Sequence, residues 1–184
     1  MTRLLLVRHG QSTWNRDGRV QGQSPDIPLT AVGRDQAGRA AIRLRDRGAA
    51  WLVSSDLLRA VETAALVGAV VGLQVALDAD LREQGMGALE GRYAHDLEAL
   101  ATPAGRHVHE ICWGGGESIV DVYARVSRFC RRLQAASVGE TVIVVSHGVT
   151  LQVLRAVAAG LGPLEIGWDD MLGNGEVLEV SCRH

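Results

Sequence analysis

The stretch LLLVRHG, residues 4–10, begins with four apolar residues and then stops on Arg8, His9 and Gly10. A short, continuous apolar run of this kind predicts a β-strand that is buried on both faces of a sheet. The abrupt change to an arginine and a histidine has two interpretations. Either the strand ends in an ordinary polar loop, or it holds a reactive histidine at its end with a cation beside it.

A second stretch, VIVVSHG at residues 142–148, repeats this pattern and ends its apolar run on Ser146 and His147. The remaining predicted strands are residues 51–53, 74–77 and 176–180, the last as an edge strand. The predicted helices are residues 31–47, 56–71, 93–101, 117–136 and 149–159, with Thr30 and Asp56 as N-caps of the first two. Alternating strands and helices favour an α/β fold. We expect three α/β/α layers around a mostly parallel central sheet, in one domain spanning residues 1–184.

The bulk composition of the chain excludes several classes of function. Its 184 residues carry a net charge of -2, which gives no reason to expect nucleic acid or an anionic membrane surface as a partner. No apolar run approaches the roughly 18 residues that suggest a membrane-spanning helix. All 19 basic residues are arginine, which excludes a lysine-dependent phosphate loop and Schiff-base chemistry. We expect a cytoplasmic protein, because the chain begins in a strand rather than a signal peptide and its three cysteines are widely spaced.

The ends of the predicted strands bring polar side chains to one edge of the sheet. In an open parallel sheet, functional groups gather beyond the carboxyl ends of the strands. Those ends carry His9, the serines at 54–55, and His147. Arg59 lies near the start of the helix after the second strand, and Glu83 follows the third strand. We therefore expect these side chains to lie close together.

This set of side chains has the chemistry for phosphoryl transfer. A neutral imidazole such as that of His9 is a nucleophile near neutral pH, and it attacks phosphorus when positive groups neutralise the phosphoryl oxygens. Arg8, Arg59 and His147 would supply those groups, and the planar guanidinium of arginine binds two oxygens at once. Glu83 would protonate the leaving alkoxide and then take a proton from the attacking water.

The same residues lie in a series of motifs that resembles the histidine phosphatase superfamily, which includes the cofactor-dependent phosphoglycerate mutases. The motifs occur in the family's order and cover most of the chain. They are LVRHGQSTWN (6–15), GRVQG (18–22), PLT with Gly33 (28–33), SSDLLRA with Thr63 and Ala64 (54–64), LRE with Gly87 and Glu90-Gly91 (81–91), GGES (115–118) and VSHG (145–148). One departure is the loop after Gly22, where Gln23, Ser24 and Pro25 make it one residue longer than is common in the family.

The resemblance implies a role for each matching residue. The implied catalytic residues are His9 as the phosphorylated nucleophile, Arg8, Arg59 and His147 as phosphoryl ligands, and Glu83 as the acid and base. The implied substrate-binding residues are Gly10, Ser12, Asn15, Gln21 and Gly148. Asn15 and Gln21 would donate from their side chains, whereas the loop after His9 and the helix start at Gly148 would donate backbone N–H groups. No metal, nucleotide or other cofactor is implied.

The family divides according to the fate of the phosphohistidine. A phosphatase lets water take the phosphoryl group, whereas a mutase returns it to a hydroxyl and carries a long basic insert before the last histidine. Here residues 84–116 contain only two arginines and three histidines as basic residues. We therefore predict a phosphomonoesterase acting on a small phosphorylated metabolite. The alternatives are a cofactor-dependent phosphoglycerate mutase and a non-catalytic phosphate-binding module, and a homodimer is compatible with the sequence.

Some residues keep two interpretations. Glu90 competes with Glu83 as the acid, although Glu83 follows the third strand directly and occupies the family's Leu-x-Glu position. His107 and His109 form an H-x-H pair, which can begin a zinc site. Because no further ligands at suitable spacing accompany them, we interpret them as rim or surface residues. Together with Arg106 they could contact anionic or sugar groups of a substrate.

Overall fold

A five-stranded sheet forms the centre of the computed structural model, which describes residues 2–97 and 102–182. The strands are β1 (Thr2–Arg8), β2 (Trp51–Ser54), β3 (Val75–Leu77), β4 (Thr141–Ser146) and β5 (Val177–Cys182). They lie in the order β3-β2-β4-β1-β5. The first four are parallel, and β5 pairs antiparallel with β1 at the edge. The predicted α/β fold with a mostly parallel sheet is confirmed, as is the predicted edge strand.

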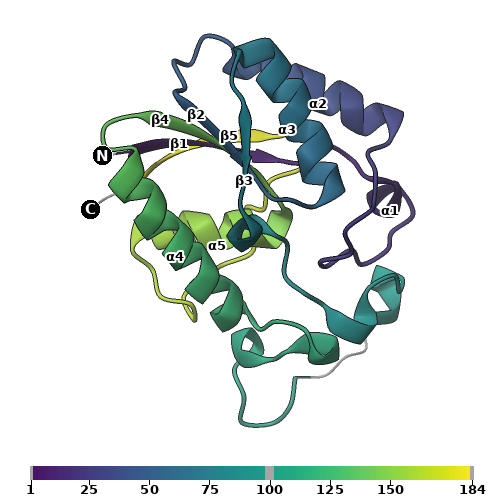
Figure 1. The fold of residues 1–184 in the computed structure, drawn as a ribbon. Coiled ribbons are helices and arrows are strands. Elements are labelled where there is room, and N and C mark those ends of the chain that lie inside the picture. Colours follow the sequence, from purple (N-terminus) through teal and green to yellow (C-terminus); the bar gives the residue numbers. More distant parts are fainter. Residues whose placement is uncertain (1, 98–101, 183–184) are drawn as a thin grey trace.

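Four long helices cover the two faces of this sheet (Figure 1). They are α2 (Ala31–Leu44), α3 (Leu58–Val71), α4 (Ile119–Ala136) and α5 (Gly148–Ala159). Leu5 and Val7 of β1 pack with α2 and α3, whereas Leu4 and Leu6 pack with α4 and α5. This alternation follows from the two-residue period of a strand, and it explains why the apolar run of β1 is continuous.

The helix starts are only partly as predicted. Thr30 caps α2, since its hydroxyl accepts a hydrogen bond from the Gly33 N–H. The prediction for Asp56 is wrong, because α3 begins at Leu58 without a side-chain cap. Asp56 instead accepts two hydrogen bonds from Arg82, at 2.7 and 2.5 Å. Both oxygens of the carboxylate are therefore engaged by Arg82 and not by the first turn of α3.

The stretch between β3 and α4 contains short turns rather than long helices. The described residues of this stretch hold five 3-10 turns, at Ala79–Leu81, Gly87–Leu89, Ala94–Leu97, Val108–Glu110 and Trp113–Gly115. A further short element, the four-residue helix α1 (Thr13–Arg16), follows β1. The helix predicted over residues 93–101 is a single 3-10 turn in its described part, and residues 98–101 lie outside the described residues. Among the described helices, none is long and apolar enough to cross a membrane.

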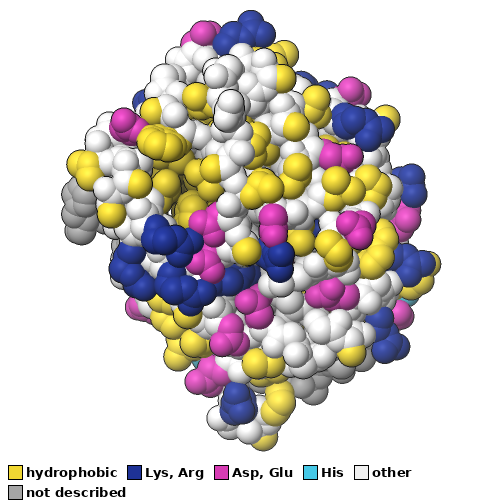
Figure 2. Space-filling model, viewed as in Figure 1, with side chains coloured by type: hydrophobic (Ala, Val, Ile, Leu, Met, Phe, Trp, Pro, Cys, Tyr) yellow, Lys and Arg dark blue, Asp and Glu magenta, His cyan; other side chains and the backbone are white. Residues whose placement is uncertain are grey.

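The exposed arginines of α4 form a surface charge network (Figure 2). Arg128 and Arg132 pair with Asp80 at 3.0 and 2.9 Å, and Arg132 also pairs with Asp78 at 2.7 Å. Figure 2 shows acidic side chains next to this arginine-rich patch. Because these arginines are exposed and paired with carboxylates, the patch does not indicate an anion-binding site.

Candidate active site

The carboxyl ends of β1 and β4 lie side by side and place two histidines together. Arg8 is in register with Ser146, so that His9 and His147 follow at the same edge of the sheet. Their ring centroids are 5.0 Å apart, and the rings are 2% and 0% exposed. The structure thus brings together the two strand-end histidines that the sequence singled out.

His9 is held as a neutral ring with a defined orientation. Its Nδ1 lies 2.7 Å from the carbonyl oxygen of Gly10, and since a carbonyl can only accept, Nδ1 carries the proton. The lone pair is then on Nε2. Burial and the charge of Arg59 hold the pKa of His9 well below its ordinary value, with a smaller contribution from Arg8. A neutral imidazole with a free lone pair is the form that a nucleophile requires.

His147 is oriented by the serine at the end of β2. Its Nε2 lies 2.9 Å from the hydroxyl oxygen of Ser55, which also accepts the N–H of Leu57 at 3.3 Å. We assign the hydroxyl proton to the contact with Nε2, which places the ring proton on Nδ1. Burial, followed by the charges of Arg59 and a protonated His9, holds the pKa of His147 well below its usual range. The ring thus offers a neutral N–H donor from Nδ1.

Arg59 is fully buried although it carries a charge. Its two terminal nitrogens donate to the carbonyl oxygens of Ser24 and Gly22, at 3.1 and 2.8 Å. Burial lowers its pKa to about 10, against the opposing charges of Glu83 and Glu90, so it remains protonated at neutral pH. The guanidinium is fixed by two backbone carbonyls, and no carboxylate of the described residues pairs with it directly, which leaves its charge available to a ligand.

Three buried nitrogens of this group lack any partner. Among the residues that the structure describes, the buried side-chain nitrogen and oxygen atoms without a hydrogen bond are Arg8 Nε, Arg59 Nε and His147 Nδ1. Each unsatisfied buried donor costs roughly 1–3 kcal/mol, and such groups are rare in native proteins. All three are donors, and they belong to the ring that contacts His9 and to the two arginines whose charges act on it. An anion with several oxygens, such as a phosphoryl group, would satisfy them together.

Glu83 lies at the start of α5, the helix that follows His147. Its carboxylate accepts the N–H groups of Val149 and Thr150 at 3.3 and 3.2 Å. The preceding Arg82 is locked to Asp56, and this fixes the turn that carries Glu83. A carboxyl beside His147 is well placed to exchange protons with a group bound there.

Glu90, the alternative acid, has a different environment. Its carboxylate accepts hydrogen bonds from the N–H groups of Gln23 and Met86 and from the hydroxyl of Ser24. These contacts join the loop after Gly22 to the segment that follows Glu83. Glu90 therefore acts as a structural anchor for this loop, which favours Glu83 as the acid.

Ser12 organises the two amides that were predicted to bind the phosphoryl group. Its hydroxyl lies 2.6 Å from Gln21 Oε1 and 3.1 Å from Asn15 Oδ1, and its N–H donates to the same Asn15 oxygen. With both amide oxygens engaged, Asn15 and Gln21 retain their amino groups as donors for a ligand.

The N–H groups that follow His9 are already used within the protein. Gly10 donates to the hydroxyl of Thr63 at 3.1 Å, and Gln11 donates to Gln36 at 2.8 Å. Gly10 also packs tightly, because a Cβ there would lie 2.1 Å from the Gly33 oxygen. These contacts favour a positioning role for the loop. Gly148 opens α5 beside Arg8, with its prospective Cβ 3.3 Å from the arginine Cζ.

Two residues of the site were given no catalytic or binding role by the sequence, although Ser55 was expected at a strand end close to the histidines. Ser55 orients His147, and its place at a predicted strand end was a usable signal. Asn174 donates to the His9 oxygen at 3.0 Å and to Asn15 Oδ1 at 3.3 Å. No local pattern marks Asn174, since its position depends on the path of the chain after α5.

The H-x-H pair is engaged in contacts of its own. His109 Nδ1 lies 2.9 Å from the Pro163 oxygen, and its Nε2 accepts the indole N–H of Trp168 at 3.0 Å. His107 accepts the His109 N–H, and Arg106 donates to the Glu110 oxygen. Within residues 2–97 and 102–182, no three His, Cys, Asp or Glu side chains gather as metal ligands.

Comparisons with known proteins agree with this geometry. The profile of the histidine phosphatase superfamily (branch 1) matches residues 4–184. The "Probable phosphoglycerate mutase GpmB" of Yersinia enterocolitica is 36% identical over 167 residues, which cover 89% of this chain and 77% of that protein. A mycobacterial glucosyl-3-phosphoglycerate phosphatase in complex with VO3 aligns with a TM-score of 0.87 and 34% identity, over 97% of this chain and 90% of that one.

A more distant solved structure extends this picture. It is a phosphoserine phosphatase mutant from Entamoeba histolytica in complex with phosphoserine, with a TM-score of 0.84 and 26% identity, over 100% of this chain and 92% of that one. The expected enzyme class, a histidine phosphatase, is confirmed at the level of the superfamily. From the ordered motifs, the paired histidines and these matches, it follows that the chain belongs to the histidine phosphatase superfamily.

Proposed function

We propose that this protein is a phosphomonoesterase that hydrolyses a small phosphorylated metabolite through a phosphohistidine on His9. The observation that carries the proposal is the set of three unpartnered buried donors, Arg8 Nε, Arg59 Nε and His147 Nδ1, around a neutral imidazole. These donors would hold the phosphoryl oxygens and neutralise the charge that develops on them in the transition state.

In the first chemical step, the Nε2 lone pair of His9 attacks phosphorus. The P–O bond to the leaving alcohol breaks, and the departing alkoxide takes a proton from the Glu83 carboxyl. Asn15 and Gln21 donate to the phosphoryl oxygens from their amino groups, and the Gly148 N–H at the start of α5 contributes a further donor. The Nδ1–H bond of His9 to the Gly10 oxygen keeps the ring aimed during the attack.

In the second step, water attacks phosphorus of the phosphohistidine and gives its proton to the Glu83 carboxylate. The P–N bond breaks, its electron pair returns to Nε2, and inorganic phosphate leaves. Glu83 is thereby protonated again and ready for the next cycle. No metal or cofactor takes part in this scheme.

The substrate is proposed as a class. The relatives named above include phosphatases of glucosyl-3-phosphoglycerate and of phosphoserine, both small phosphomonoesters. The short interval between Glu83 and α4 favours transfer to water over transfer to a second hydroxyl. The name of the GpmB relative keeps phosphoglycerate mutase as the second candidate. A cytoplasmic location and a homodimer stay predictions.

A phosphate-release screen over a panel of phosphorylated metabolites tests the proposal. The wild type should release phosphate from at least one of them, and His9→Ala should lower the rate by about a thousandfold or more, as expected for a missing nucleophile. His95→Ala changes an exposed histidine and should keep the wild-type rate. A His9→Ala protein with wild-type rates would overturn the mechanism.

Two further measurements separate the alternatives. Fast isomerisation of 3-phosphoglycerate with a trace of 2,3-bisphosphoglycerate, without phosphate release, would identify a mutase. A protein that turns over no phosphoester and forms no acid-labile phosphorylated species would be a phosphate-binding module. Activity that is lost with EDTA would indicate a metal, with His107 and His109 as the first residues to examine.

A further inference from the structure

The chain after α5 returns across the candidate active site as a segment that we call the return segment, residues 167–175. Near its end it contacts the first strand through backbone groups. Arg8 Nη1 donates to the Leu172 oxygen at 2.6 Å. The Gly175 N–H donates to the Arg8 oxygen at 3.0 Å and the His9 oxygen at 3.3 Å. The return segment thus holds both the side chain of Arg8 and the backbone of the nucleophile.

Asn174 adds a side-chain contact at the same place. Its amino group donates to the His9 oxygen at 3.0 Å and to Asn15 Oδ1 at 3.3 Å. The Ser12 N–H donates to the same Asn15 oxygen at 3.1 Å. The amino group of Asn174 therefore connects the backbone of His9 to the side chain of Asn15. Because Asn174 and Ser12 both donate to Oδ1 of Asn15, the amino group of Asn15 points away from them.

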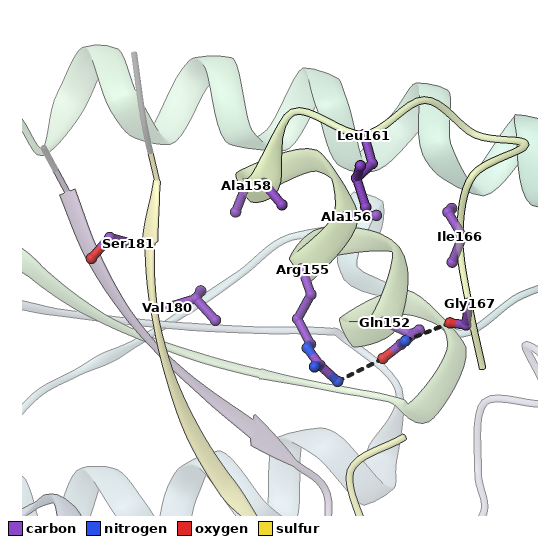
Figure 3. A pocket seen from close by; sticks show the side chains of 10 residues that line it. Gln152, Arg155, Ala156, Ala158, Leu161, Ile166, Gly167, Val180 and Ser181 are labelled. Carbon is purple, nitrogen blue, oxygen red and sulfur yellow. Dashed lines mark hydrogen bonds between the residues drawn. The ribbon is translucent and has the colours of Figure 1, made fainter. Parts of the chain in front are cut away.

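The other end of the return segment is held by α5 at the edge of a cavity of about 570 Å³ (Figure 3). Gln152 Nε2 donates to the Gly167 oxygen at 2.5 Å, and Arg155 Nη1 donates to the Asp170 oxygen at 2.5 Å. Arg155 also donates to Gln152 Oε1 at 2.9 Å, and Figure 3 shows the contacts of Gln152 with Arg155 and with Gly167. The segment is therefore anchored at both ends.

We propose that Asn174 is a positioning residue of the phosphoryl site, which fixes the main chain of His9 and the amide of Asn15 in the orientation for transfer. This inference rests on the proposed function. A misplacement of about 1 Å can cost an enzyme roughly a hundredfold in rate, so two hydrogen bonds at the nucleophile matter more than two at the surface.

The chemistry of the contact requires a donor. Both atoms that face Asn174 Nδ2 are acceptors, namely the His9 carbonyl and Asn15 Oδ1. Asn174→Ala removes both hydrogen bonds, and Asn174→Asp keeps the shape but places a negatively charged acceptor against two acceptors. We expect the aspartate variant to be at least as impaired as the alanine variant.

The test compares these variants with Gln152→Ala, which removes a hydrogen bond from the far end of the same segment while Arg155 still holds it. Asn174→Ala should lower kcat/KM for the best substrate of the wild type by about 10- to 100-fold. The kcat/KM of Gln152→Ala should stay within about twofold of the wild type. Its loss of unfolding free energy in urea denaturation should be similar to that of Asn174→Ala. Equal activity losses in the two variants, or an active Asn174→Asp protein, would overturn the inference.

A double-mutant cycle with Asn15→Ala provides a readout that a purely structural role would not change. If Asn174 acts partly through Asn15, its replacement should cost much less in the Asn15→Ala background than in the wild type. Additive losses would contradict this coupling. Calorimetric binding of inorganic phosphate separates the two proposals. A wild type without hydrolysis refutes the proposed function, whereas phosphate affinity that Asn174→Ala leaves unchanged refutes the positioning role.

Discussion

Acidification should destabilise this protein before most of its carboxylates titrate. His9 and His147 are buried as neutral rings, and burial, followed by the charge of Arg59, holds both pKa values well below 6.5. In the unfolded chain both rings regain an ordinary pKa and take up protons as the pH falls below about 6.5. The unfolded state then binds more protons than the folded state, so the free energy of unfolding decreases as the pH falls.

The size of the effect follows from the two rings. Near pH 5.5 an unfolded histidine is about nine-tenths protonated, so each ring contributes about 1.2 kcal/mol per pH unit. Together they remove up to about 4 kcal/mol between pH 7 and pH 5, the amount for two rings that stay neutral throughout in the folded protein, and a typical free energy of unfolding is about 5–15 kcal/mol. Hydrogen bonds from Arg82 lower the pKa of Asp56. The contribution of Asp56 to the free energy of unfolding is therefore lost only near about pH 4 and below, where the carboxyl of the unfolded chain takes up a proton.

Urea unfolding in half-unit pH steps between pH 5 and 7.5 measures this slope. His9→Asn and His147→Asn each remove one titrating ring, so each variant should retain about half of the wild-type slope between pH 5 and pH 6. A wild-type free energy of unfolding that is constant over this range would refute the reasoning. So would a slope that neither substitution reduces, because the protons would then be taken up elsewhere.

Three further substitutions test separate parts of the site. Glu83→Gln should lower kcat/KM for an alkyl phosphate by about a hundredfold or more, but much less for para-nitrophenyl phosphate, whose leaving group needs no proton. Ser55→Ala should lower kcat/KM by about tenfold, because His147 loses the donor that fixes its tautomer. Gly10→Ala should lower the free energy of unfolding by about 1–3 kcal/mol in urea denaturation, since its Cβ would collide with the Gly33 oxygen.

Much of the fold could be predicted because its strands carry local signals. The run at residues 142–145 is apolar throughout, and in the structure each of its residues is fully buried. The stretch between β3 and α4 lacks such periodicity. Its turns are held by contacts between residues far apart in the sequence, as when Glu117 accepts hydrogen bonds from Gln23 and from the Gly85 N–H. Contacts of this kind form only in the folded protein, so no local sequence pattern predicts them.

The candidate site was predictable to the same extent. His9 and His147 follow buried strands, and the strand-end rule brings them to one edge without knowledge of any side-chain contact. Asn174 could not be found in this way, because it reaches His9 from 165 residues further along the chain. The structural role of Glu90 was hidden for a similar reason, since its partners Gln23 and Ser24 lie on a distant loop.

The expected acid sensitivity and the proposed affinity for phosphate have one physical origin. Burial keeps the two histidines neutral, and it also leaves Arg8 Nε, Arg59 Nε and His147 Nδ1 without a partner among the described protein residues. These donors point to no protein acceptor, so an anion that fills the site would engage them and would stabilise the folded protein by binding to it alone. A site with solvent-exposed histidines would tolerate acid better, because its rings would titrate as they do in the unfolded chain. It would also hold the phosphoryl group less firmly, because the charge interactions would be screened by solvent.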